Sequence, residues 1–240
     1  VSLMPIPTVV LVHGAFADAS TFQPVTKALL EAGIPVTAAA APNRGLISDA
    51  AAVRAVVTAI DGPVLLVGHS YGGAVITEAG SADNVVALLY LAGYALAEGE
   101  SLAQMQGRFP DSQLPAALVQ APYPPTANTP GGIDFTVDAA RFADILAADV
   151  DPALASVLAV SQRPLAGVAF DEPATTAAWR GRPTWGVLCR SDQGLRPEVQ
   201  RFGYERAGAA IREVDSSHLV MLSQPAFVID TIREILVALG

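Results

Sequence analysis

Short apolar runs alternate with amphipathic segments along the first part of the chain. Four runs rich in valine and leucine are typical of strands buried on both faces, at residues 8–12, 35–39, 63–67 and 85–91. Segments with helical spacing lie between them, at residues 22–32, 48–60 and 72–82, and Ser48 is the predicted N-cap of the second. Because strands and helices that alternate through short connections form a parallel sheet covered on both faces, the pattern predicts an α/β fold.

The alternation stops after Leu91 and resumes near Pro183. The last part of the chain predicts strands at 184–189 and 210–214 and helices at 197–207 and from Pro225 onward. Between the two parts lies a proline-rich stretch, followed by helical spacing at residues 138–148 and 152–161. We therefore predict one core built from residues 1–92 and 183–240, with residues 93–182 inserted as a helical lid.

The composition supports a globular chain and limits its partners. Hydrophobic residues make up 52% of the 240 positions and charged residues 15%, which excludes a disordered chain. The net charge of -9, without a cluster of Lys or Arg, argues against binding to nucleic acid or to an anionic membrane. The apolar runs are too short to cross a bilayer and no secretory signal pattern is present, so we expect a cytoplasmic protein. The single cysteine, Cys189, excludes an internal disulfide.

A glycine-rich turn joins the third predicted strand to the helix after it. It contains Gly68, Ser70 and Gly72 in the pattern Gly-x-Ser-x-Gly, between a strand and a helix. A turn this tight leaves no room for side chains two positions before and after the serine. The turn exposes the Ser70 hydroxyl at a helix N-terminus, where developing negative charge is favoured. Ser70 is thus the candidate nucleophile, and a glycine-rich turn that arose by chance is the alternative.

A second candidate motif begins with His13 and Gly14, directly after the first predicted strand. In a doubly wound sheet this strand end lies beside the serine turn, at the switch point where ligands bind. Backbone N–H groups of Ala15 and Tyr71 are then the predicted oxyanion hole, with Phe16 as an alternative donor. The alternative is a turn that leads into a helix capped by Asp18 or Ser20, and the two interpretations can hold together.

The chain has three histidines, so a base that activates Ser70 must be one of them. His69 is adjacent to Ser70 and its side chain must point away from the serine, while His13 belongs to the first turn. We expect structural roles for both. His218 lies in a polar loop after the last strand, which emerges at the same edge of the sheet as the serine turn. His218 is therefore the predicted base.

The base needs a carboxylate to orient it. Asp192 follows the strand at residues 184–189 and precedes His218, which gives the order Ser, Asp, His typical of sequences with this serine turn. Asp215 is closer in sequence, but it shares a short loop with His218 and is poorly placed to reach its ring. We predict Asp192 as the orienting acid and keep Asp215 as the alternative.

Together these motifs resemble the α/β-hydrolase superfamily over nearly the whole chain. They are similar in particular to the small branch that holds plant-type esterases, methyl-ester hydrolases and hydroxynitrile lyases. The resemblance implies a mostly parallel sheet of about six strands, with Ser70, His218 and Asp192 as nucleophile, base and acid, and no metal or cofactor. Lyases of this branch carry a threonine and a lysine where this chain has Gly14 and Leu219, which favours an esterase.

The sequence thus predicts a serine hydrolase that cleaves carboxylic esters or lactones of small to medium hydrophobic substrates through an acyl-enzyme. Substrate contacts are expected from Phe16, Tyr94, Tyr123 and Leu219, and Phe135 and Phe142 of the lid are further candidates. Two other functions stay open at this point. These are a cofactor-free perhydrolase or haloperoxidase and a hydrolase-fold receptor for a small molecule with slow turnover. The partner is expected to be a small-molecule ester, and the chain can be a monomer or a dimer.

Overall fold

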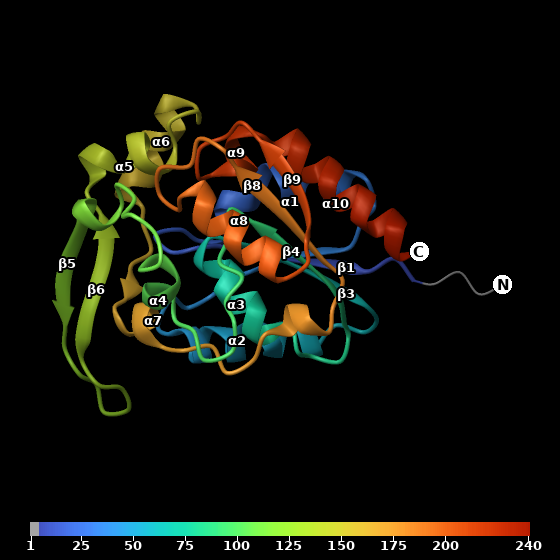
Figure 1. The fold of residues 1–240 in the computed structure, drawn as a ribbon, viewed down its shortest axis with the longest axis horizontal. Coiled ribbons are helices and arrows are strands. Elements are labelled where there is room, and N and C mark those ends of the chain that lie inside the picture. The colour runs from blue at the N-terminus through green and yellow to red at the C-terminus, as the bar shows by residue number, and fades with distance from the viewer. Residues whose placement is uncertain (1–4) are drawn as a thin grey trace.

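A parallel sheet of six strands forms the centre of the molecule in the computed structural model, which describes residues 5–240 (Figure 1). The strand order is β2-β1-β3-β4-β8-β9, and every neighbouring pair is parallel. The strands are β1 (Thr8–Val12), β2 (Val36–Ala39), β3 (Val64–His69), β4 (Val85–Leu91), β8 (Thr184–Cys189) and β9 (Ala210–Val214). The predicted class and number of strands are confirmed.

The connections of the first three strands create a switch point at the carboxyl ends of β1 and β3. The chain runs from β1 outward to β2 and then crosses back to β3 on the other side of β1. Because such crossovers are right-handed, this reversal places the helices that follow β1 and β2 on opposite faces of the sheet. Ligands of open α/β sheets bind at such a reversal.

Helices cover both faces of this sheet, so its central strands are buried on both sides. Val9–Val12 of β1 and Val64–Val67 of β3 are fully buried. α1 packs against α10, and α2 packs against α3. The elements flanking the sheet are η1 (Ala19–Phe22), α1 (Gln23–Glu31), α2 (Leu46–Thr58), α3 (Tyr71–Ala79), α8 (Pro197–Arg206), α9 (Val220–Ser223) and α10 (Pro225–Leu239).

The structure corrects the predicted N-cap of one helix and decides between the two candidate caps of another. α2 begins at Leu46 after Gly45, so Ser48 lies inside its first turn and is not the N-cap. The Ser48 hydroxyl instead donates to the Gly45 carbonyl at 3.1 Å. Asp18 is the N-cap of η1, and its side chain accepts a hydrogen bond from the Ser20 backbone. None of the helices in the described part of the chain is long and apolar enough to cross a membrane.

The segment between β4 and β8 contains the predicted helices near residues 138–148 and 152–161, and also strands that the expectation of a helical lid did not include. Three antiparallel strands form a separate sheet, and Figure 1 shows β5 and β6 as a ribbon at one end of the molecule. The proline-rich stretch that was not assigned to an element contains much of this ribbon. The elements of the segment are α4 (Leu102–Gln106), η2 (Pro115–Ala117), β5 (Leu118–Tyr123), β6 (Gly132–Val137), α5 (Ala139–Leu146), α6 (Pro152–Val160), β7 (Leu165–Ala166), α7 (Val168–Asp171) and η3 (Ala178–Arg180).

Candidate active site

Ser70 lies in a strained turn between β3 and α3. Its backbone has φ 54 and ψ -122, a region that residues with a side chain rarely adopt. A Cβ atom on Gly68 would collide with the Gly72 carbonyl, and one on Gly72 would collide with the Val12 carbonyl. Both glycines are thus required sterically, because the strand end, the turn and the helix start approach one another closely.

His218 and Asp192 form a hydrogen-bonded pair beside this turn. His218 Nδ1 lies 2.7 Å from Asp192 Oδ2, and Asp192 is 2% exposed. The other carboxylate oxygen accepts the backbone N–H groups of Gly194 at 2.8 Å and Leu195 at 2.9 Å. Gln200 also donates to Oδ2, at 2.9 Å. Since the carboxylate accepts all four bonds, Nδ1 of His218 carries a proton that it donates to Asp192.

The alternative acid points elsewhere. Asp215 Oδ1 accepts a hydrogen bond from the Ser191 hydroxyl at 2.6 Å. Its backbone carbonyl lies 3.4 Å from the side-chain amide of Gln224. The structure therefore brings Asp192, not Asp215, to the His218 ring. Asp192 gains this position because it follows β8, whose carboxyl end lies beside that of β9.

The turn that begins with His13 meets the serine turn. A Cβ atom on Gly14 would lie 2.8 Å from Ser70 Cβ and 3.0 Å from the His69 carbonyl, so only glycine allows this approach. Ala15, in the same turn, lines a cavity together with Ser70. Tyr71 is the first residue of α3 and directly follows Ser70. The two predicted oxyanion donors thus come from the two turns that meet at the serine.

The other two histidines are buried and neutral. Burial lowers the pKa of His13. Its Nε2 accepts the backbone N–H of Ala41 at 3.0 Å, so its Nδ1 carries the proton and donates to the Gly14 carbonyl at 2.9 Å. Burial, with a smaller contribution from the nearby His218, holds the pKa of His69 well below its usual value. Neither ring is placed as a base for Ser70, as expected from the sequence.

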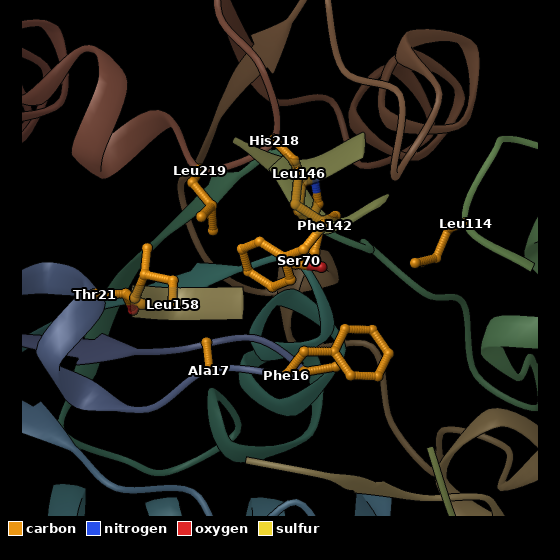
Figure 2. Close-up of a pocket in the computed structure, with 11 residues that line it drawn as sticks. Phe16, Ala17, Thr21, Ser70, Leu114, Phe142, Leu146, Leu158, His218 and Leu219 are labelled. Atoms are coloured by element: carbon orange, nitrogen blue, oxygen red, sulfur yellow. The ribbon is translucent and has the colours of Figure 1, made fainter. Parts of the chain in front are cut away.

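Ser70 and His218 line one small cavity between the sheet and the inserted segment (Figure 2). The cavity volume is about 20 Å³, room for about one ordered water, so a larger ligand enters only if side chains of the wall move. No Asp, Glu, Lys or Arg is among its lining residues. These are Ala15, Phe16, Ala17, Thr21, Ser70, Leu114, Phe142, Leu146, Leu158, His218 and Leu219.

The predicted substrate residues divide into two groups. Phe16 and Leu219 line the cavity, and so does Phe142, whereas Tyr94 and Tyr123 are placed elsewhere. The backbone N–H of Tyr94 donates to the Ser70 carbonyl at 3.2 Å, which makes Tyr94 a neighbour of the turn. Tyr123 lies on β5, with the Arg44 guanidinium 5.4 Å from the centre of its ring.

The sequence did not predict three of the leucines that line the cavity. Leu146 lies at the end of α5, and Leu158 lies on α6. Leu114 comes from the loop before η2. The apolar face of α5 was a signal for Leu146, because α5 has a strongly one-sided pattern of apolar residues that must face something. For Leu114 and Leu158 the sequence offered no comparable signal.

The fold and this arrangement of turns define an α/β hydrolase. The chain belongs to the alpha/beta hydrolase family, whose model matches residues 9–231. The resemblance inferred from the motifs is thereby confirmed. An alpha/beta hydrolase of Aspergillus novofumigatus, nvfD, is 27% identical over 252 residues, which cover 95% of each protein.

Solved structures of the same fold include two plant-type enzymes and a bacterial one. Polyneuridine aldehyde esterase has a TM-score of 0.82 at 20% identity and covers 96% of this chain and 99% of its own. The methylesterase MES16 from Arabidopsis has a TM-score of 0.79 at 17% identity, with 96% and 99% coverage. A pyrethroid hydrolase from Sphingobium faniae has a TM-score of 0.78 at 19% identity and covers 98% of each chain. At these identities the likeness shows a shared fold.

Proposed function

We propose that this protein is a serine hydrolase that cleaves carboxylic esters or lactones of small to medium hydrophobic substrates through an acyl-enzyme. The observation that carries the proposal is the buried pair of His218 and Asp192, 2.7 Å apart, at a cavity that also holds Ser70. A serine needs a base in contact to become a nucleophile, and an imidazole held by a carboxylate provides one.

The proposed reaction uses groups of the protein alone. Nε2 of His218 takes the proton of Ser70 as the hydroxyl oxygen attacks the substrate carbonyl. Asp192 stabilises the imidazolium that forms, and the backbone N–H groups of Ala15 and Tyr71 bind the oxyanion, with Phe16 as the alternative donor. His218 then gives its proton to the leaving alcohol. Water attacks the acyl-enzyme with His218 again as base, and the acid leaves.

Two observations support an ester as the substrate. The cavity wall is mostly apolar and contains no Asp, Glu, Lys or Arg, which suits a neutral hydrophobic acyl group. The structural neighbours include proteins named as an esterase, a methylesterase and a pyrethroid hydrolase. Small-molecule esters are therefore the first class to test, with lactones as their cyclic counterparts.

A fluorophosphonate probe followed by intact-mass analysis tests the nucleophile, and a panel of esters and lactones tests the reaction. We expect one adduct on the wild-type protein and none on Ser70→Ala. The turnover of Ser70→Ala should fall on the order of several powers of ten, as it does when other serine hydrolases lose their nucleophile. Ser81→Ala is the matched control, since Ser81 lies in the exposed turn after α3. Turnover by Ser70→Ala close to that of the wild type would refute the proposal.

The same preparation distinguishes the two other functions. A perhydrolase or haloperoxidase would require hydrogen peroxide for its principal activity, so the panel is run with and without peroxide. A receptor with slow turnover would bind a small hydrophobic ligand and be labelled at Ser70, yet would hydrolyse none of the esters at a useful rate. Rapid hydrolysis without peroxide supports the esterase.

A further inference from the structure

The tyrosine after Ser70 is anchored on a neighbouring helix by its side chain. Tyr71 is 1% exposed, and its hydroxyl donates to Asp49 Oδ2 at 2.7 Å. Asp49 lies on α2, 22 residues earlier in the chain, and is fully buried. A buried carboxylate destabilises the fold unless hydrogen bonds satisfy it. The bond to Tyr71 therefore stabilises the packing of α2 on α3.

The second oxygen of Asp49 is also occupied. Asp49 Oδ1 accepts the backbone N–H of Arg44 at 3.0 Å, and the Asp49 backbone donates to the Gly45 carbonyl at 2.9 Å. Burial raises the pKa of Asp49, and burial together with Asp49 raises the pKa of Tyr71 well above its usual value. Tyr71 therefore keeps its proton and acts as a donor. The carboxyl group is fixed from the start of α2 on one side and holds the tyrosine on the other.

The backbone N–H of Tyr71 is the group that the proposed function assigns to the oxyanion hole. As the first residue of α3, its N–H group has no acceptor inside the helix. The carbonyl of the peptide that carries this N–H group belongs to Ser70 and accepts the backbone N–H groups of Gly73 at 2.9 Å and Tyr94 at 3.2 Å. These bonds hold the peptide between Ser70 and Tyr71 at its carbonyl, and the bond from the Tyr71 side chain to Asp49 supplies a second fixed point on the residue that carries the N–H group.

We propose that Asp49 and the Tyr71 hydroxyl are a positioning pair that aims the Tyr71 backbone N–H at the oxyanion formed on Ser70. The inference rests on the proposed function. A donor that is oriented before the reaction stabilises the transition state without reorganising, whereas a loosely held donor loses part of this stabilisation. The loss appears in kcat more than in KM, because the ground-state carbonyl depends little on this donor.

The other explanation of the bond is that it only stabilises the packing of α2 against α3. In that case its removal lowers the melting temperature and leaves the kinetics of the folded enzyme unchanged. A matched control is needed to separate the two. Tyr90 provides one, because it is fully buried on β4 and its hydroxyl lies 2.9 Å from Thr77 Oγ1. Tyr90→Phe and Tyr71→Phe each remove one buried hydroxyl that is bonded to a side chain.

The experiment compares kcat, KM, melting temperature and affinity for an aliphatic trifluoromethyl ketone, which forms a tetrahedral oxyanion on a serine. For Tyr71→Phe we expect kcat and the affinity for the ketone to fall by about tenfold, with KM within about twofold. Tyr90→Phe should leave all three within about twofold of the wild type. Asp49→Asn keeps one acceptor oxygen, so its kcat should fall less than that of Asp49→Leu. If Tyr71→Phe does not fold, the comparison of these two Asp49 variants tests the inference instead.

Two results would overturn the inference, and only one of them would also overturn the proposed function. If Tyr71→Phe matches Tyr90→Phe in kcat and ketone affinity while Ser70→Ala is inactive, the positioning pair is refuted and the proposed function stands. If Ser70→Ala keeps its turnover, the proposed function fails and the inference fails with it.

Discussion

His69 donates a hydrogen bond from Nε2 to the backbone carbonyl of His218, over a distance of 2.9 Å. The carbonyl can only accept, so His69 carries its proton on Nε2. The two residues are 149 positions apart, and His69 directly precedes Ser70. The bond therefore ties the loop of the proposed base to the turn of the proposed nucleophile. Asp192 holds the His218 ring, and His69 holds its backbone.

Replacing His69 with phenylalanine tests this tie. We expect His69→Phe to lower kcat by roughly tenfold with little change in KM, since the position of the base shifts while the cavity wall is kept. Trp179→Phe is the control. Trp179 also donates a ring N–H to a backbone carbonyl, that of Leu96 at 2.7 Å, but neither residue lines the cavity. Equal kcat in the two variants would mean that the His69 bond serves stability alone.

The choice between Asp192 and Asp215 is tested by the same substitution at both positions. An amide at residue 192 presents an N–H group to His218 Nδ1 and favours the wrong tautomer of the ring. Asp192→Asn should therefore lower kcat on the order of a thousandfold or more. Asp215→Asn should retain near wild-type kcat, since Asp215 bonds to Ser191 and not to the base. A severe loss in Asp215→Asn alone would reverse the assignment.

The buried neutral histidines predict a loss of stability in mild acid. The pKa values of His13 and His69 are lowered from 6.5 in the folded protein, mainly by burial. Below about pH 6.5 the unfolded chain binds protons that the folded protein does not, so the free energy of unfolding falls by up to about 1.4 kcal/mol per pH unit for each histidine. Asp49 has the opposite effect on the free energy of unfolding, because burial raises its pKa in the folded protein from the usual value of 3.8.

Urea unfolding between about pH 7.5 and about pH 5.5 measures this effect. His13→Asn removes one of the two titrating groups and keeps a donor and an acceptor at the site. Its free energy of unfolding should therefore depend less steeply on pH than that of the wild type. An unchanged slope would show that His13 does not remain neutral in the folded protein.

The close approach of the two turns predicts a large effect of one added methyl group. In Gly14→Ala the new Cβ atom would lie 2.8 Å from Ser70 Cβ, so one of the turns must shift. We expect kcat to fall on the order of a hundredfold, as displacements of about 1 Å do in other active sites. Gly181→Ala is the control, because no atom of residues 5–240 other than its chain neighbours lies within 4 Å of its Cβ position, and its φ of -121 suits any residue. Similar kcat values in the two variants would contradict the steric argument.

The central sheet could be predicted from the sequence because most of its strands are apolar runs, although β9 contains Arg212 and Glu213. β1, β4, β8 and β9 have the bounds that the pattern predicts, since polar residues or turns end each run. The pairing of Asp192 with His218 could also be predicted. Three histidines and the order of the strands leave few combinations, and parallel strands bring their carboxyl ends to one edge.

Contacts of the inserted segment could not be predicted in the same way. β5 has mostly exposed residues and a proline at position 122, so it lacks the apolar alternation that identifies a strand. Tyr123 looked like a residue of the cavity because it is aromatic, but its neighbour is Arg44, far away in sequence. Asp49 gave no signal at all. An acidic residue in a helix is ordinarily exposed, and only the packing of α2 on α3 buries it beside Tyr71.

The uncharged wall of the cavity also bears on the end of each catalytic cycle. An ester enters as a neutral molecule, whereas the acid released from it is an anion at neutral pH. An anion is poorly solvated among aliphatic and aromatic side chains, and among the residues lining this cavity there is no Lys or Arg to hold it. The net charge of -9 adds a repulsive field around the whole molecule. In an ester hydrolase with such a cavity, the acid product is expected to dissociate readily, and accumulated acid is expected to inhibit the enzyme only weakly.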